Sequence, residues 1–87
     1  MNSIEKLRTD LKMSKTEFAR IFNISPSAVA QWETGVNTPN QVNNAIMLKL
    51  REKLDKKDDV KSVITNLLLG AGFLALLTWI FSENSKK

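Results

Sequence analysis

The fold is decided by residues 14–35, which read SKTEFARIFNISPSAVAQWETG. The stretch opens on a capping-box pattern, because Ser14 stands three residues before Glu17 and such a pair satisfies two backbone N–H groups at the start of a helix. Ser25–Pro26 is a second start signal, an N-cap residue followed by a first-turn proline. The stretch therefore predicts two short helices, one that starts at Ser14 and one that covers about 26–33.

A short turn joins these two predicted helices. Asn23 falls where a tight turn needs a residue that tolerates left-handed φ, and Gly35 supplies the usual left-handed stop after the second helix. Two helices joined by three or four residues make a helix-turn-helix. We expect its buried side to carry Phe18, Ala19, Phe22, Val29 and Trp32.

Two further helices are predicted on either side of this unit. Apolar residues recur at three- and four-residue intervals from Ile4 to Leu11, which predicts a helix over about 3–12. After Pro39 the chain restarts as a helix over about 41–54. Its apolar residues are expected to close the core and to broaden the apolar surface: Val42, Ala45, Ile46 and Leu50 for the core, then Met47, Leu48 and Leu54 for the surface.

Composition limits the chemistry of the chain. Its 87 residues leave room for one small domain and an appendage, and its net charge of +4 suits a polyanionic partner such as nucleic acid or an anionic membrane surface. Histidine and cysteine are both absent, which removes the commonest general base and metal ligands. The carboxylates show no metal-loop spacing. We therefore expect a binding module, not an enzyme, with no catalytic residue, metal, cofactor or evident small-molecule substrate.

The C-terminal part has a different composition. We interpret residues 1–54 as the helix-turn-helix domain, 55–62 as a charged linker, 63–81 as one hydrophobic helix and 82–87 as a polar tail. No charged residue occurs in 63–81, and nineteen helical residues at ~1.5 Å each span roughly 28 Å, close to the ~30 Å hydrocarbon core of a bilayer. The composition predicts a single transmembrane anchor.

Flanking charges orient this predicted anchor. Basic residues are more numerous before it than after it, where only Lys86 and Lys87 remain, and no secretory signal opens the chain. We expect a single-pass protein of the bacterial cytoplasmic membrane, with the N-terminal domain in the cytoplasm. The alternative is a cytoplasmic protein whose C-terminal helix is buried in a dimer interface. In either case one helix face is expected to make the membrane or oligomer contact: Leu68, Gly72, Ala75 and Trp79.

The N-terminal motifs resemble a known family. Ser14-Lys15-Thr16-Glu17-Phe18-Ala19, Asn23-Ile24-Ser25-Pro26-Ser27-Ala28-Val29, Trp32-Glu33-Thr34-Gly35 and Pro39 resemble the Xre/Cro/cI-type helix-turn-helix family over about residues 4–54. Within it, the Ser-Pro-Ser-Ala-Val and Trp-Glu-Thr-Gly segments are most similar to the DNA-binding domains of antitoxins of the MqsA and HigA kind. The resemblance implies an all-α, lambda-repressor-like domain of four helices, which the long hydrophobic helix would follow.

This resemblance also implies where DNA would bind. The second helix of the motif enters the major groove, and the family's base-reading positions fall on Ser27, Ala28 and Gln31. Gln31 is suited to bidentate pairing with adenine, and Ala28 to a thymine methyl group. Phosphate contacts are expected from Lys15, Thr34, Asn37 and Thr38.

The chain departs from the family at Lys15, where glutamine is usual. It also has no basic residue in the second helix of the motif, which is called the recognition helix because it would read the DNA bases. Non-specific affinity is therefore expected from Lys12, Lys15, Arg20 and Arg8.

Three functions are compatible with these features. The leading hypothesis is a dimeric transcriptional regulator of the repressor type, bound to double-stranded DNA and tethered to the membrane by its C-terminal helix. The first alternative is a membrane-anchored helix-turn-helix module for protein interaction, which resembles RodZ-like proteins. The second is an antitoxin whose tail binds a partner. The small or polar side chains expected on the recognition face favour DNA.

Overall fold

The computed structural model describes residues 2–56 and 59–82, and these form six helices and no strand. The helices are α1 (Ser3–Asp10), α2 (Lys15–Phe22), α3 (Pro26–Thr34), α4 (Gln41–Lys56), α5 (Val60–Gly70) and α6 (Phe73–Phe81). The all-α prediction is confirmed. Lys57 and Asp58 of the predicted linker, and all of the predicted polar tail except Ser82, lie outside the described residues.

Local capping signals place the ends of the helix-turn-helix as expected. The Glu17 backbone N–H donates to Ser14 Oγ at 3.1 Å, and the Ser14 backbone N–H donates to Glu17 Oε1 at 2.9 Å, which completes the capping box of α2. Asn23 ends α2 in the left-handed region with φ 57°, and Gly35 ends α3 with φ 82°. The first helix is shorter than predicted, because the chain leaves α1 after Asp10.

The core of the first four helices follows the predicted pattern except in α4, where Met47, expected on the surface, is only 8% exposed and Ala45, expected in the core, is half-buried. Phe18 and Val29 are completely buried, and the Phe22 ring packs edge to face against both Phe18, with centroids 5.0 Å apart, and Trp32, at 5.3 Å. The prediction that Val42 closes the core is wrong, because its side chain is 62% exposed. Val42 lies in the first turn of α4, one turn before the buried stripe begins at Ile46.

The hydrophobic C-terminal stretch is a hairpin of two helices, so the prediction of one long helix over 63–81 is wrong. α5 ends at Gly70, and Gly72 has φ 95° and ψ −174°, a conformation that L side chains rarely adopt. The backbone N–H groups of Ala71 and Gly72 both donate to the Leu67 carbonyl, at 2.9 and 2.7 Å, which closes the end of α5. Glycines on both sides of Ala71 weaken the helix there, and the chain reverses.

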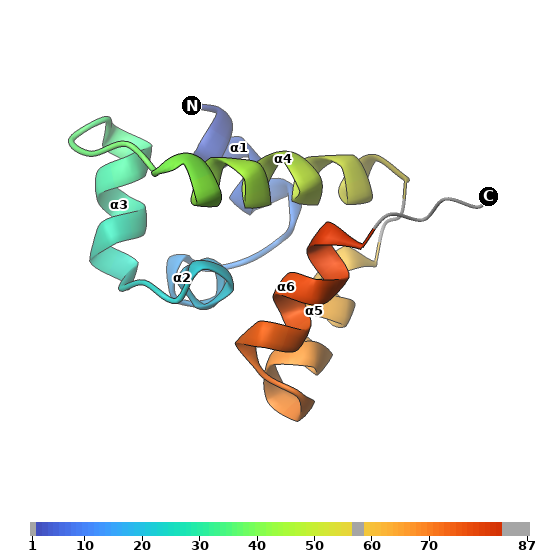
Figure 1. Ribbon diagram of the computed structural model, residues 1–87. Coiled ribbons are helices and arrows are strands. Elements are labelled where there is room, and N and C mark those ends of the chain that lie inside the picture. Colours follow the sequence, from blue (N-terminus) through green and yellow to red (C-terminus); the bar gives the residue numbers. More distant parts are fainter. Residues whose placement is uncertain (1, 57–58, 83–87) are drawn as a thin grey trace.

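The hairpin packs on the helix-turn-helix domain (Figure 1). α6 lies against α4 and also meets α2. Val60, Ile64, Leu76 and Ile80 are completely buried in the same core as Leu50 of α4. Part of the apolar surface that gave the stretch its membrane-like composition is thus covered by other helices of the same chain, while Leu69 and Leu74 stay exposed.

Two further contacts, one from the start of α5 and one from the end of α6, join the hairpin to the rest of the chain. Lys61, in the first turn of α5, donates from Nζ to the Lys12 carbonyl at 2.8 Å and lies 3.7 Å from Glu17 Oε1. On α4, Lys53 Nζ lies over the Trp79 ring of α6, 4.6 Å from its centroid. The hairpin therefore contacts the connection between α1 and α2 as well as α4.

This arrangement overturns the membrane prediction. None of the helices in residues 2–56 and 59–82 is long and apolar enough to cross a membrane. α5 has 11 residues and α6 has 9, whereas a spanning helix needs about 20. The single-pass membrane location predicted from the composition is therefore wrong.

The predicted membrane or oligomer face is also not a single surface. Leu68 belongs to α5, Gly72 lies in the reversal, and Ala75 and Trp79 belong to α6. A common face required an unbroken helix through all four positions. In the hairpin each of these residues is half-buried.

Candidate nucleic-acid interface

The recognition helix α3 lies at one end of the molecule and the hairpin at the other (Figure 1). α2 crosses beneath α3 and packs closely against it. At the start of α3, Ser25 Oγ accepts a hydrogen bond from the Ala28 backbone N–H at 3.2 Å, and Pro26 occupies the first helical position. The hairpin thus leaves the outer face of α3 uncovered.

The base-reading residues that the resemblance implies lie on this helix with different exposure. Ser27 and Gln31 are exposed, and they stand four residues apart, which places them one above the other on one face. Ala28 is half-buried beside them. The structure therefore presents two polar side chains, one helical turn apart, with a small apolar side chain next to them.

Gln31 is the centre of a set of hydrogen bonds at the C-terminal end of α3. Its side-chain Oε1 accepts from Asn37 Nδ2 at 2.5 Å. Its backbone carbonyl accepts from the N–H groups of Val36, at 2.9 Å, and Asn37, at 3.3 Å. Thr34 Oγ1 donates to the same carbonyl at 3.3 Å and to the Ala30 carbonyl at 3.1 Å. Three implied site residues, Gln31, Thr34 and Asn37, are brought together here.

The other two implied phosphate contacts flank this cluster. Thr38 is exposed in the loop between α3 and α4. Lys15 is the first residue of α2, its side chain is about half exposed, and its Nζ lies 3.9 Å from Glu33 Oε1 on α3. Because Lys15 stands at the N-terminus of a helix, its charge adds to the partial positive charge of the free N–H groups there.

Arg8 is directed inward and not toward a DNA-facing surface. Its Nε donates to Glu33 Oε2 at 2.6 Å, its Nη2 donates to Glu33 Oε1 at 3.2 Å, and its Nη1 donates to the Met13 carbonyl at 3.1 Å. The hydrogen bond to Glu33 raises the pKa of the Arg8 guanidinium above its ordinary value. The expected contribution of Arg8 to DNA affinity is therefore replaced by a structural role, the joining of α1 to α3.

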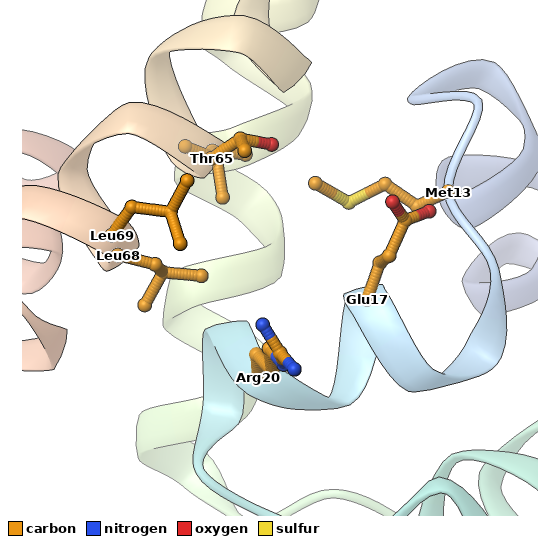
Figure 2. Close-up of a pocket in the computed structure, with 7 residues that line it drawn as sticks. Met13, Glu17, Arg20, Thr65, Leu68 and Leu69 are labelled. Atoms are coloured by element: carbon orange, nitrogen blue, oxygen red, sulfur yellow. The ribbon is translucent and has the colours of Figure 1, made fainter.

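Arg20 faces the hairpin. It lines a small groove between α2 and α5 with Glu17, Thr65 and apolar side chains, as Figure 2 shows. The cavity volume of about 60 Å³ is well below the roughly 300–1,000 Å³ of small-molecule sites. Within the part of the chain that the structure describes, no group of acidic residues is arranged to hold a metal ion.

Sequence reasoning missed a link between the N-terminus and the recognition helix. Asn2 Oδ1 accepts from the Glu5 backbone N–H at 2.8 Å, which caps α1. The same side chain donates from Nδ2 to the carbonyls of Trp32, at 3.1 Å, and Glu33, at 2.9 Å. The spacing of Asn2 and Glu5 is a readable capping signal. The bonds to the last turn of α3 carry no local signal, because they join residues about thirty positions apart.

Comparison with known proteins agrees with this geometry. The family model Helix-turn-helix (HTH_3) matches residues 4–57, which include α2 to α4, all of α1 except Ser3, and more than half of the chain. No curated protein and no solved structure matches the chain. The matched segment contains the turn at Asn23 and the recognition helix. The chain belongs to the Xre/cI-like helix-turn-helix family, whose domain implies DNA binding.

Proposed function

We propose that this chain is a sequence-specific transcriptional regulator of the repressor type. The observation that carries the proposal is the exposed polar face of α3, with Ser27 and Gln31 one turn apart at the end of the molecule away from the hairpin. A DNA-reading helix needs such a face, whereas a protein-docking surface usually exposes large apolar anchors. The family match supports the DNA-binding part of the proposal.

In this proposal α3 lies in the major groove and α2 crosses the DNA backbone. Ser27, Ala28 and Gln31 contact base edges. Lys15 and the free N–H groups at the start of α2 bind phosphate, and residues of the loop after α3 bind phosphate on the other side. Thr38 is exposed there, and Thr34 and Asn37 lie beside Gln31.

A single domain of this kind has few phosphate contacts, because Arg8 is paired with Glu33 and Arg20 faces the hairpin. We therefore propose that two copies bind a roughly palindromic operator. Their recognition helices would lie about 34 Å apart, one turn of DNA. The exposed apolar side chains of α4, Val42 and Leu48, are available for contact between copies. The second copy then binds at a high effective concentration.

The antitoxin alternative placed a partner on the C-terminal stretch, whereas the protein-interaction module placed its partner on the helix-turn-helix and a membrane anchor on that stretch. Ile64 and Leu76 are completely buried against helices of the same chain, so binding through these residues would first require the hairpin to leave the core. The resemblance to antitoxins stays a prediction. The packing of the hairpin supports the regulator in preference to a tail-binding function.

The proposal is tested by selecting operators from a pool of random duplex DNA with the full-length protein. Binding of the wild-type protein and Gln31→Ala is then measured on the selected sequence and on a scrambled one. Loss of the carboxamide should weaken specific binding by roughly 1–3 kcal/mol, about 5- to 150-fold, and leave binding to the scrambled sequence unchanged. Gln41→Ala, at an exposed position on α4, is the matched control.

Two results would contradict this proposal in different ways. Equal loss on both sequences would show that Gln31 does not read bases. If the wild-type protein enriches no sequence from the pool, the chain is not a sequence-specific regulator. A gel-filtration and cross-linking measurement on the operator complex would show whether two copies bind.

A further inference from the structure

Lys61 brings a positive charge from the hairpin to the start of α2. Its Nζ donates to the Lys12 carbonyl at 2.8 Å and lies 3.7 Å from Glu17 Oε1. The Lys61 side chain is 42% exposed, so its charge acts on the solvent side of the helix and not within the core. Lys61 belongs to α5 and lies outside residues 4–57, the segment that matches the family. The charge is therefore an addition to the family's domain.

An acidic side chain lies at the same end of α2, where the proposed function places a DNA phosphate. Glu17 Oε1 accepts from the Ser14 backbone N–H at 2.9 Å. The capping box occupies the N–H groups of Ser14 and Glu17. The N–H groups between them, of Lys15 and Thr16, have no carbonyl partner within the helix and are the ones a phosphate can take. A phosphate bound there would lie beside the Glu17 carboxylate and be repelled by it.

The ammonium group of Lys61 offsets this repulsion. It lies beside Oε1 of Glu17, the oxygen that accepts from the Ser14 backbone, and its bond to the Lys12 carbonyl holds it there. Interactions between exposed charges extend over about 10 Å at 0.1 M salt, so a phosphate at the helix start feels both members of the pair. Their opposite charges largely cancel, which leaves the phosphate attracted by Lys15 and by the partial positive charge of the helix N-terminus.

We propose that Lys61 is a positioning residue for DNA binding, which neutralises Glu17 and so permits a phosphate to bind at the start of α2. This inference rests on the proposed function, in which α2 crosses the DNA backbone. Lys61 acts through Glu17 and touches no base. The hairpin therefore contributes to the affinity for DNA without contributing to sequence preference.

Charge substitutions at Lys61 in the full-length protein test this role. Lys61→Met removes the charge and keeps an unbranched apolar side chain. It should weaken binding to the selected operator and to a scrambled duplex by the same factor, about 3- to 10-fold at about 0.1 M salt. The loss should shrink at about 0.5 M salt, where screening is stronger. Lys61→Arg keeps the charge and should bind both duplexes as the wild-type protein does.

The double variant Lys61→Met/Glu17→Gln separates the effect of charge from an effect on packing. With both charges removed, no carboxylate repels the phosphate, so affinity should return to within about twofold of the wild-type value. If Lys61 acted only by holding the hairpin in place, the double variant would bind no better than Lys61→Met, because it also loses the charged acceptor of the capping box.

Lys53→Met is the matched control for the loss of a lysine that contacts the hairpin. Lys53 Nζ lies over the Trp79 ring of α6, but Lys53 stands in the last turn of α4, at the end that points away from α3 (Figure 1). Its substitution should change the affinity for either duplex by less than about twofold, because the charge lies far from the start of α2.

The outcomes separate this inference from the proposed function. Unchanged binding in Lys61→Met, or no recovery in the double variant, would overturn the role of Lys61 and leave the regulator proposal standing. If the selection enriches no sequence, the regulator proposal fails, while the measurements on the scrambled duplex still test Lys61. Failure of the wild-type protein to bind either duplex would overturn both.

Discussion

Arg8 and Glu33 form a two-point ion pair, with Nε 2.6 Å from Oε2 and Nη2 3.2 Å from Oε1. The two side chains are 12% and 5% exposed, so solvent screens the pair little. The pair joins α1 to the last turn of α3, next to the backbone bonds of Asn2. The recognition helix is therefore fixed from the side opposite its exposed face.

Removing one member of this pair should destabilise the protein strongly. Arg8→Met leaves the Glu33 carboxylate with Lys15 Nζ, 3.9 Å away, in place of the two-point contact, and we expect a loss of up to about 3–5 kcal/mol in the free energy of unfolding. The double variant Arg8→Met/Glu33→Leu should lose less than Arg8→Met alone, because no unpaired charge remains. Urea unfolding measures these values. A loss below about 1 kcal/mol would mean that the pair behaves as an exposed surface pair.

The hairpin should unfold together with the helix-turn-helix domain. Leu76 is completely buried between the helices, so Leu76→Ala should lower the free energy of unfolding by about 2–5 kcal/mol. Leu74→Ala, on the same helix but 76% exposed, should change it by no more than about 0.5 kcal/mol. Urea unfolding should follow one transition in both variants. Equal stability of the two variants would contradict the packing of α6 against α4.

Lys15 should contribute to DNA affinity without contributing to sequence preference. Lys15→Gln should weaken binding to the selected operator and to a scrambled duplex by the same factor, and it should reduce the slope of log K against log salt concentration by about 1. The control is Lys56→Gln at the far end of α4 from α3 (Figure 1). An unchanged slope in Lys15→Gln would show that Lys15 does not contact phosphate.

The stability of the protein should fall in acid through Glu17. The hydrogen bond from the Ser14 backbone, with smaller contributions from Lys61, holds the pKa of Glu17 below its ordinary value of 4.5. A depressed pKa in the folded state means that the unfolded chain takes up the proton first as the pH falls. The stabilisation is therefore complete above the ordinary value and is lost as the pH falls through the folded-state pKa.

This pH dependence is measured by urea unfolding between pH 7 and pH 3. Glu17→Gln keeps an acceptor for the Ser14 N–H but has no charge to lose, so its stability should fall less steeply below pH 4.5 than that of the wild-type protein. Asp10, whose pKa is lowered chiefly by the hydrogen bond to Arg51, should still titrate in the variant, so part of the loss of stability in acid should remain. Identical pH profiles for the two proteins would argue against the capping box as the cause.

Sequence patterns predicted the parts of the fold that depend on neighbouring residues. The capping box at Ser14, the left-handed Asn23 and the stop at Gly35 are all present, because each is fixed by the chemistry of a few adjacent positions. The most consequential wrong prediction concerned the hydrophobic stretch. An uncharged run has the same composition whether it spans a bilayer or packs on α4, and the distinguishing signal was the pair of glycines around Ala71.

The candidate site was predictable only in part. The exposure of Ser27 and Gln31 agrees with the positions that the family resemblance implied. The bond between Asn37 and Gln31 depends on the path of the loop after Gly35, and no periodic pattern encodes that path. The pairing of Arg8 with Glu33 joins residues 25 positions apart, which is why a basic residue expected on the surface proved to be internal.

The contact between Lys61 and the Lys12 carbonyl has a consequence for the order of folding. It joins positions 49 residues apart, whereas α2 and α3 are joined by a turn of a few residues. Closing a long loop costs more conformational entropy than closing a short one, so local contacts generally form first. We expect the helix-turn-helix to form early and the hairpin to dock late. Substitutions in α5 and α6 should then accelerate unfolding more than they slow folding.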